Sequence, residues 1–278
     1  MDCRSFDLSN REYVLNYGIY GNPHRRGNHC SGCFVSPAKP LEKNEAVSGQ
    51  ILRRFLRLRH QTIVEKGHPV IERIQNARLY GILDLGYVTS ADCEQVTREM
   101  LEWGIEILQL RAKRIPKQEI PELARRLAPL CNEAGVPFIL NDYPELVAAC
   151  GADGVHVGQD DMSVAQARAL AGHGKIVGLS THSLSQVKAA SEQAPDYIGF
   201  GPLFPTPTKP DYLAIGTEEI AQAHSLVDFP IFCIGGIKAD NLPQVMKAGA
   251  RRVVIVSGIL QADNRAEYIK ACLKTLAA

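Results

Sequence analysis

The chain has 278 residues, of which 45% are hydrophobic and 22% are charged, and its formal net charge is +1. These values are typical of a globular protein with enough apolar residues for a full core, and a net charge this small argues against a nucleic-acid-binding protein. No run approaches the roughly 18 consecutive apolar residues that a membrane-spanning helix needs, so we expect no membrane partner.

The start of the chain differs from a signal peptide, because it lacks both a basic start and an apolar core. The eight cysteines are scattered along the sequence, and five of them fall among the regular elements described below. Reduced, buried thiols in a cytoplasmic protein explain those five. We therefore expect a cytoplasmic setting.

Residues 1–78 do not share the pattern of the remaining chain, and we expect them to form an accessory extension. Positions 1–46 contain scattered glycine and proline with little periodicity, which predicts irregular structure. Positions 47–65 space their apolar residues as a helix does, with arginines between them. A second helical turn is expected at Val70–Ala77.

Charge is divided unevenly between the two parts. Residues 1–79 carry 13 Lys or Arg and 7 Asp or Glu, a net charge of +6, whereas residues 80–278 carry 18 and 23, a net charge of −5. We therefore expect the extension to dock on the second part, or to meet another acidic surface.

The extension contains four side chains of the types that bind metals within a span of ten residues, namely His24, His29, Cys30 and Cys33. One Cys-x-x-Cys pair with two histidines upstream is not a standard zinc spacing, and no second pair follows. A metal site at this place is left open.

From residue 79 onward, short apolar runs alternate regularly with amphipathic helical patterns. The expected strands are Leu79–Asp84, Glu106–Leu110, Pro137–Asn141, Gly154–Val157, Lys175–Leu179, Tyr197–Gly201, Pro230–Ile234 and Arg252–Ser257. The expected helices lie around 92–103, 117–134, 144–150, 163–171, 184–194, 217–226, 241–248 and 265–276. Eight such units predict an α/β fold in which residues 79–278 form a closed (β/α)8 barrel. A doubly wound open sheet is the alternative, although it rarely needs eight units of this even length.

Polar residues follow several of these strands, at the rim where barrels of this kind build their sites. Arg111 and Lys113 are separated by one residue, so both side chains are expected on one face, where two cations suit a diphosphate. The alternative is a solvated strand end with ordinary surface ion pairs.

The next two strands end in carboxylates. Asn141-Asp142 and Asp160-Asp161 are expected close together at neighbouring strand ends, and two carboxylates with phosphate oxygens suit Mg²⁺. The alternative for an aspartate is helix capping, since Asp161 or Ser163 could cap the helix that follows. Capping does not easily account for both aspartates.

Glycine after strands seven and eight predicts a phosphate site. Gly235-Gly236 and Ser257-Gly258 occupy the loops that usually hold phosphate in these barrels, where only backbone without Cβ lets several N–H groups approach one anion. A proline-rich loop after strand six adds Thr206, Thr208 and Lys209. We expect this loop to present two hydroxyls and an ammonium in a fixed arrangement.

In combination these residues resemble the thiamine phosphate synthase family, also called thiamine-phosphate pyrophosphorylase, over residues 79–277. The matching stretches are Gln109–Lys113, Asn141-Asp142, Gly151–Asp161, Gly178–His182, Asp196–Gly201 with Pro205–Lys209, Gly235–Ile237 and Val256–Ile259. The resemblance implies a (β/α)8 enzyme that joins 4-amino-2-methyl-5-hydroxymethylpyrimidine diphosphate to 4-methyl-5-(2-phosphoethyl)thiazole, giving thiamine phosphate and diphosphate. These small molecules would be its partners, and a homo-oligomer is left open.

The resemblance also implies a role for each matched position. Gln109 would contact the pyrimidine, and Ser180 would lie beside the reacting pyrimidine and diphosphate. The diphosphate would be contacted by Arg111, Lys113, Asn141 and Lys209. Mg²⁺ would be bound by Asp142 and Asp161. The thiazole phosphate end would be held by Thr206, Thr208, Gly236, Val256 and Ser257. The catalytic residues would be Arg111, Lys113, Ser180 and Lys209.

Two other functions are considered. A thiazole tautomerase of the same superfamily would share the fold and the thiazole phosphate site, but it has no use for a diphosphate and metal site. A barrel without activity could bind thiamine precursors and signal through the basic extension. The cations and carboxylates at the rim favour the synthase over the tautomerase.

Overall fold

The computed structural model describes residues 69–206 and 213–278 of the chain. The expected helix at 47–65 and the four histidines and cysteines of the extension lie outside the described residues. So do Thr208 and Lys209.

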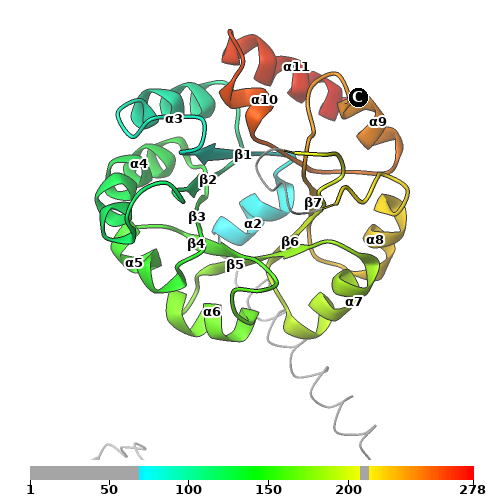
Figure 1. The fold of residues 1–278 in the computed structure, drawn as a ribbon, viewed down its shortest axis with the longest axis horizontal. Helices are drawn as coiled ribbons and strands as arrows, with labels where there is room; N and C mark the ends of the chain where they lie inside the picture. Colours follow the sequence, from blue (N-terminus) through cyan, green and yellow to red (C-terminus); the bar gives the residue numbers. More distant parts are fainter. Residues whose placement is uncertain (1–68, 207–212) are drawn as a thin grey trace, which may run out of the picture. The chain divides into compact units, whose positions relative to one another are not determined.

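Eight parallel strands close into a barrel in sequence order, which confirms the predicted fold (Figure 1). The strands are β1 (Leu79–Asp84), β2 (Ile107–Arg111), β3 (Phe138–Asn141), β4 (Gly154–Val157), β5 (Ile176–Thr181), β6 (Tyr197–Phe200), β7 (Ile231–Cys233) and β8 (Val253–Ile255). β1 and β4 have the predicted bounds, and the other strands differ from their predicted bounds by one or two residues at one or both ends.

Helices surround the barrel and connect its strands (Figure 1). They are α3 (Cys93–Glu102), α4 (Ile120–Ala134), α5 (Val147–Cys150), α6 (Val164–Ala171), α7 (Leu184–Gln193), α8 (Ile220–Leu226), α9 (Leu242–Lys247), α10 (Ser257–Leu260) and α11 (Arg265–Ala277). Two 3₁₀ turns, η1 (Lys117–Glu119) and η2 (Pro144–Leu146), precede α4 and α5. Among the described residues, no helix is both long and apolar enough to cross a membrane.

Strand alternation divides the core into two layers. All six residues of β1 are buried, because helices cover one face and the barrel interior receives the other. Leu79 and Leu83 pack with the helices, whereas Tyr80 and Ile82 pack with the inward-facing side chains of other strands. Continuous apolar strands are expected in a parallel sheet that is buried on both faces.

The expected helical turn at 70–77 is present as α2 (Pro69–Asn76), which lies across the barrel in Figure 1. Ile74 is 1% exposed and belongs to the same apolar cluster as Ile107 and Ile139, which face the barrel interior. α2 therefore packs with the interior of the barrel, although it precedes the boundary at residue 79 that the sequence pattern predicts.

The last strand is shorter than expected. The prediction extended it to Ser257, but β8 ends at Ile255 and Ser257 begins α10, which the prediction missed. An apolar run alone cannot distinguish the end of a strand from the start of a short helix. β8 also pairs with β7 at one position, Cys233 with Val253, whereas β1 and β2 pair at five.

Candidate functional site

A cavity opens at the carboxyl ends of the strands, lined by residues of the barrel interior and of the loops that follow the strands. Small-molecule sites of barrels are built at this end. Most of the predicted site residues that the structure describes line the cavity, namely Gln109, Arg111, Asn141, Ser180, Thr206, Gly236, Val256 and Ser257. The structure therefore brings together side chains from six strands and the loops after them.

Arg111 lies at the end of β2 and is held by a residue that the prediction missed. Its Nη1 atom lies 2.8 Å from Oδ2 of Asp84, which ends the neighbouring strand β1 and is 2% exposed. The second carboxylate oxygen of Asp84 accepts a hydrogen bond from the backbone of Gly86 at 2.8 Å. A buried carboxylate with two partners fixes the position of the arginine that faces the cavity.

Lys113 lies at the rim rather than in the cavity. Its Nζ atom lies 3.3 Å from Oδ2 of Asp142, and its side chain is 48% exposed. Of the two cations, Arg111 lines the cavity and Lys113 does not, and each is paired with a different carboxylate. The ammonium of Lys113 and the carboxylate of Asp142 form one charged group at the ends of β2 and β3.

Asp142 has an unusual backbone conformation for a residue that is not glycine. Asp142 and Tyr143 have φ values of 58° and 51°, in the left-handed region. The Asp142 amide donates to the carbonyl oxygen of His156 at 2.9 Å, which ties the end of β3 to β4. Such conformations cost about 1–3 kcal/mol each and cluster at functional sites, which supports a functional reason for the direction of this carboxylate.

Helix capping accounts for neither predicted metal ligand. Ser163 caps α6 by accepting a hydrogen bond from Gln166, in a capping box that does not include Asp161. The 3₁₀ turn after Asp142 has Tyr143 as its N-cap, and no side chain caps it. Asp161 Oδ2 instead accepts a hydrogen bond from the backbone of Gly158 at 2.6 Å. The capping alternative is therefore wrong for both aspartates.

The donor set at this rim fits Mg²⁺ only if a ligand completes it. No group of three or more His, Cys, Asp or Glu side chains is close enough to hold a metal in the ranges 69–206 and 213–278. Mg²⁺ commonly binds through one or two carboxylates, water and substrate phosphate oxygens. Asp142 follows β3 directly and Asp161 lies in the loop after β4, and both carboxylates are oxygen donors of the kind that Mg²⁺ takes.

Two glycines shape the opposite side of the cavity, after β7. Gly235 and Gly236 have φ values of 98° and 66°, which side chains rarely adopt. A Cβ atom on Gly236 would lie 2.7 Å from Cβ of Phe204 and 2.8 Å from the carbonyl oxygen of Pro205. The loops after β6 and β7 thus approach each other so closely that only glycine fits. Thr206 and Ser257 line the cavity at the same side.

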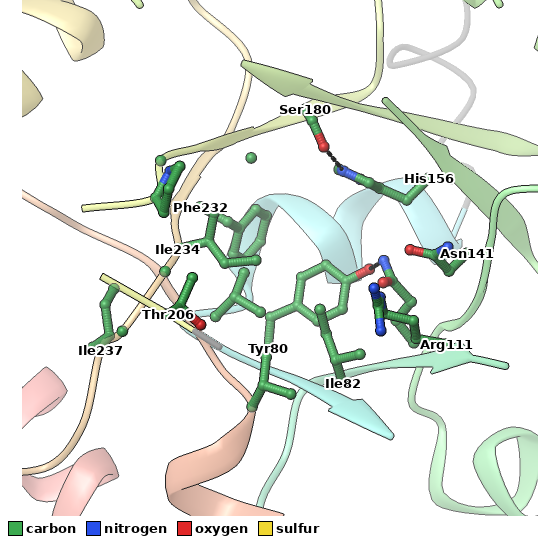
Figure 2. A pocket seen from close by; sticks show the side chains of 18 of the residues that line it. Tyr80, Ile82, Arg111, Asn141, His156, Ser180, Thr206, Phe232, Ile234 and Ile237 are labelled. Atoms are coloured by element: carbon green, nitrogen blue, oxygen red, sulfur yellow. Dashed lines mark hydrogen bonds between the residues drawn. The ribbon is translucent and has the colours of Figure 1, made fainter. Parts of the chain in front are cut away.

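A hydrogen-bonded chain of five polar side chains crosses the interior of the cavity from β2 to β5. Gln109 Nε2 donates to the Tyr80 hydroxyl at 2.9 Å, and that hydroxyl lies 3.0 Å from the hydroxyl of Tyr197. His156 places Nδ1 3.2 Å from the Tyr197 hydroxyl and Nε2 2.9 Å from Oγ of Ser180. Figure 2 shows the contact between His156 and Ser180. The chain thus connects two predicted substrate-binding residues, Gln109 and Ser180.

The two tyrosines of this chain remain protonated at physiological pH. Burial raises the pKa of Tyr80 well above its usual value, although its hydrogen bonds to Tyr197 and Gln109 act in the opposite direction. Burial and the neighbouring Tyr80 raise the pKa of Tyr197 in the same way. Each hydroxyl therefore carries one hydrogen, which it can donate to one neighbour only.

Sequence reasoning assigned no role to Tyr80, His156, Tyr197 or Asp84. The period of two along each strand would have directed these side chains inward, because they lie an even number of residues from inward positions. What the sequence could not provide was the register between strands, which decides which inward side chains meet.

Comparison with known proteins gives consistent results. A family model described as thiamine monophosphate synthase matches residues 79–259. A thiamine-phosphate synthase of Shouchella clausii is 39% identical over 202 residues, which are 72% of this chain and 95% of that protein. A thiamine-phosphate synthase of Prochlorococcus marinus is 29% identical, over 94% of this chain and 87% of that protein. The solved structure of thiamine phosphate pyrophosphorylase from Pyrococcus furiosus has a TM-score of 0.67 and 30% identity, covering 74% of this chain and 97% of that one.

Proposed function

This chain belongs to the thiamine monophosphate synthase family, and we propose that it joins 4-amino-2-methyl-5-hydroxymethylpyrimidine diphosphate to 4-methyl-5-(2-phosphoethyl)thiazole. The products are thiamine phosphate and diphosphate. One observation supports this function most directly: one cavity is lined both by Arg111 and Asn141, at the ends of β2 and β3, and by Thr206, Gly236 and Ser257, in the loops after β6, β7 and β8. A single pocket can therefore hold two anionic substrates with their reacting ends turned toward each other.

The reaction breaks the bond between the pyrimidine methylene carbon and the diphosphate oxygen, which leaves with the electron pair. The electron-rich aminopyrimidine stabilises the methylene cation that remains, and the lone pair of the thiazole nitrogen forms the new carbon–nitrogen bond. No protein nucleophile takes part. Catalysis therefore depends on neutralising the leaving group and aligning the two substrates.

The rim after β2 and β3 would bind the diphosphate. Arg111 is held in place by Asp84 and faces the cavity, so it would donate to diphosphate oxygens without first being ordered. Asn141 would donate through its side-chain amide. Lys113 would add a point charge at the rim, and Lys209 a second one from the loop after β6.

Asp142 and Asp161 would hold Mg²⁺ together with diphosphate oxygens and water. When bound, the cation supplies positive charge next to the leaving group. Lys113 lies beside Asp142 and would keep that carboxylate in position before the ligand arrives.

The loops after β6, β7 and β8 would bind the phosphate of the thiazole. Gly236 offers backbone at a position where a side chain does not fit, and Thr206 and Ser257 offer hydroxyls. Thr208 and the backbone of Val256 complete this set. The apolar lining of the cavity, with Ile82 and Phe232, would accommodate the two rings.

The test is an assay of the purified protein with both precursors and Mg²⁺, in which thiamine phosphate and diphosphate are measured. The synthase produces both in equal amounts. A tautomerase would convert the thiazole without releasing diphosphate, and a binding protein would bind the precursors without turnover. Either of these results would contradict the proposed function.

We also propose a cytoplasmic setting, as the cysteines indicate. Within the part of the chain that the structure describes, all five cysteines are free and buried. Burial raises the pKa of Cys93 to about 11, so its thiol is unreactive at neutral pH. Fractionation of cells that express the tagged protein would test this setting.

A further inference from the structure

Three residues of the hydrogen-bonded chain have no role in the function proposed above. Tyr80, Tyr197 and His156, here called the relay, connect Gln109 at one end to Ser180 at the other. Tyr80 and Tyr197 are 1% and 0% exposed. Buried polar groups of this kind are retained only where their hydrogen bonds are satisfied, which makes their order informative.

In each member of the relay, the hydrogen bond on one side determines whether the member donates or accepts on the other side. A neutral imidazole has one nitrogen that donates and one that accepts, and a hydroxyl has one hydrogen. Tyr197 and Ser180 contact opposite nitrogens of His156. In the neutral form of this ring, a hydrogen bond received on one side therefore requires one donated on the other. A break in this order at either tyrosine leaves a buried hydroxyl hydrogen without an acceptor, at a cost of about 1–3 kcal/mol.

The relay therefore has two ordered states. In the first, the Gln109 amide nitrogen donates to Tyr80, every hydrogen points toward Ser180, and the Ser180 hydroxyl donates into the cavity. In the second, every hydrogen points toward Gln109, whose carbonyl oxygen then faces Tyr80 and whose amide nitrogen faces the cavity. The first state is the one that the structure contains at Gln109.

We infer that the relay couples the two ends of the pyrimidine site and selects an amino-substituted over an oxo-substituted pyrimidine. This inference rests on the proposed function. A diphosphate only accepts hydrogen bonds, so it favours the state in which Ser180 donates. That state also turns the carbonyl oxygen of Gln109 toward the ligand, where it accepts from an amino group. An oxo group at the same place accepts hydrogen bonds, so it would require the second state, in which the Gln109 amide nitrogen faces the ligand. In that state the Ser180 hydroxyl donates to His156 and cannot donate to the diphosphate.

Space for the relay is provided by one glycine of β5. A Cβ atom on Gly178 would overlap the Tyr197 ring and would lie 2.5 Å from Nδ1 of His156. Gly199 on β6 is a natural comparison, because a Cβ atom there would lie 3.6 Å from Cε1 of His156, an ordinary contact. Neither glycine has a φ value in the left-handed region, so alanine adds only its methyl group.

The experiment compares the binding of two pyrimidine diphosphates to the full chain by calorimetry, with Mg²⁺ and without the thiazole phosphate. One is the 4-amino substrate, and the other is its 4-oxo analogue. We expect the wild type to prefer the amino ligand by about tenfold or more, and Tyr197→Phe to reduce this ratio by about fivefold or more. Tyr197 does not contact Gln109 in the chain of hydrogen bonds, so the effect must pass through Tyr80.

The variants separate coupling from general damage. A structural role alone would weaken both ligands equally and leave the ratio unchanged, which would overturn the inference. Tyr80→Phe gives the same test should Tyr197→Phe fail to fold by circular dichroism. Gly178→Ala should lower the ratio, and Gly199→Ala should keep the wild-type ratio.

Wild-type turnover is measured in the same preparation. Synthesis of thiamine phosphate together with an unchanged ratio in the variants overturns the relay and leaves the proposed function intact. Absence of synthesis together with a reduced ratio overturns the proposed function and supports the relay.

Discussion

Asp84 Oδ2 and Arg111 Nη1 lie 2.8 Å apart, at paired positions where β1 and β2 end. The side chain of Asp84 is 2% exposed, and that of Arg111 is 16% exposed. The direction of Arg111 is therefore set by the fold before any ligand arrives. A site that is ordered in advance loses less entropy on binding than one whose side chains must be immobilised.

Replacing Asp84 tests this role. In Asp84→Asn, the amide keeps an acceptor for Gly86 but loses the charge that holds Arg111. We expect kcat/KM for the pyrimidine diphosphate to fall by about tenfold or more, because the arginine is no longer positioned. Glu94→Gln is the control, since it removes an ion pair to Arg126 that is exposed on both sides and should change kcat/KM less than about twofold. Equal kinetics in both variants would contradict the prediction.

The two rim aspartates should be needed for turnover. Asp142→Asn and Asp161→Asn should each lower kcat by about tenfold or more, because each removes a carboxylate that would hold Mg²⁺, and the cation neutralises the leaving group. Ser163→Ala lies two residues beyond Asp161 and removes the cap of α6, so it should cost about 1 kcal/mol of stability but little activity. Full activity in EDTA, or in either aspartate variant, would show that the metal assignment is wrong.

Gly236→Ala should impair binding of the thiazole phosphate by more than backbone strain alone would cause. Gly236→Ala places a methyl group against Phe204 and Pro205, so KM for the thiazole phosphate should rise by about tenfold or more. Gly151 is a matched control, with a φ of 63° against 66° and an added Cβ atom 3.5 Å from its nearest neighbour. Gly151→Ala should therefore lose stability from backbone strain alone and keep this KM. Similar KM values in the two variants would argue against a phosphate site at Gly236.

His224 on α8 should make stability depend on pH. Burial, with smaller contributions from Arg251 and Arg252, lowers its pKa from 6.5 to about 4. Between these values the unfolded chain binds a proton that the folded protein does not, so stability should fall as the pH falls from 6.5 toward 4. The His224→Gln variant should show a shallower loss of Tm across this window. Identical slopes for the variant and the wild type would contradict this assignment.

Removal of the extension should depend on where the chain is cut. A protein that begins at Pro69 keeps α2 and every predicted catalytic group, so it should retain synthase activity. A protein that begins at Arg78 loses Ile74, whose buried side chain alone contributes about 1.5–3 kcal/mol, and it should melt at a lower temperature. If the longer truncated protein folds by circular dichroism but has no turnover, residues 1–68 take part in the active site.

The sequence predicted the strands well because each one is a short apolar run between helical patterns. Leu79–Asp84 and Gly154–Val157 were predicted to the residue. The end of β8 was not predicted correctly, because the apolar run Val253–Val256 continues past the last residue of the strand, Ile255, almost to the start of α10. Local pattern carries no information about where a buried strand turns into a buried helix.

The candidate site could be predicted where chemistry follows a strand end in sequence. Arg111 and Asn141 were identified in this way, Ser180 was identified from the family resemblance, and all three line the cavity. Asp84 was missed because a lone aspartate at a strand end has many explanations, and only pairing with Arg111 gives it a role. Tyr80 and Tyr197 were missed for a similar reason, since residues 117 positions apart meet only when the barrel closes.

The boundary between β7 and β8, here called the seam, has one register pair, fewer than any other pair of neighbouring strands in the barrel. The glycine loop follows one of these strands and Ser257 follows the other, so an anion seated there would bridge the seam from above. Fluctuations that separate the two strands would be suppressed when the anion binds, and the occupied barrel would resist unfolding more than the empty one. A substrate that binds there would thus stabilise the barrel in which it reacts.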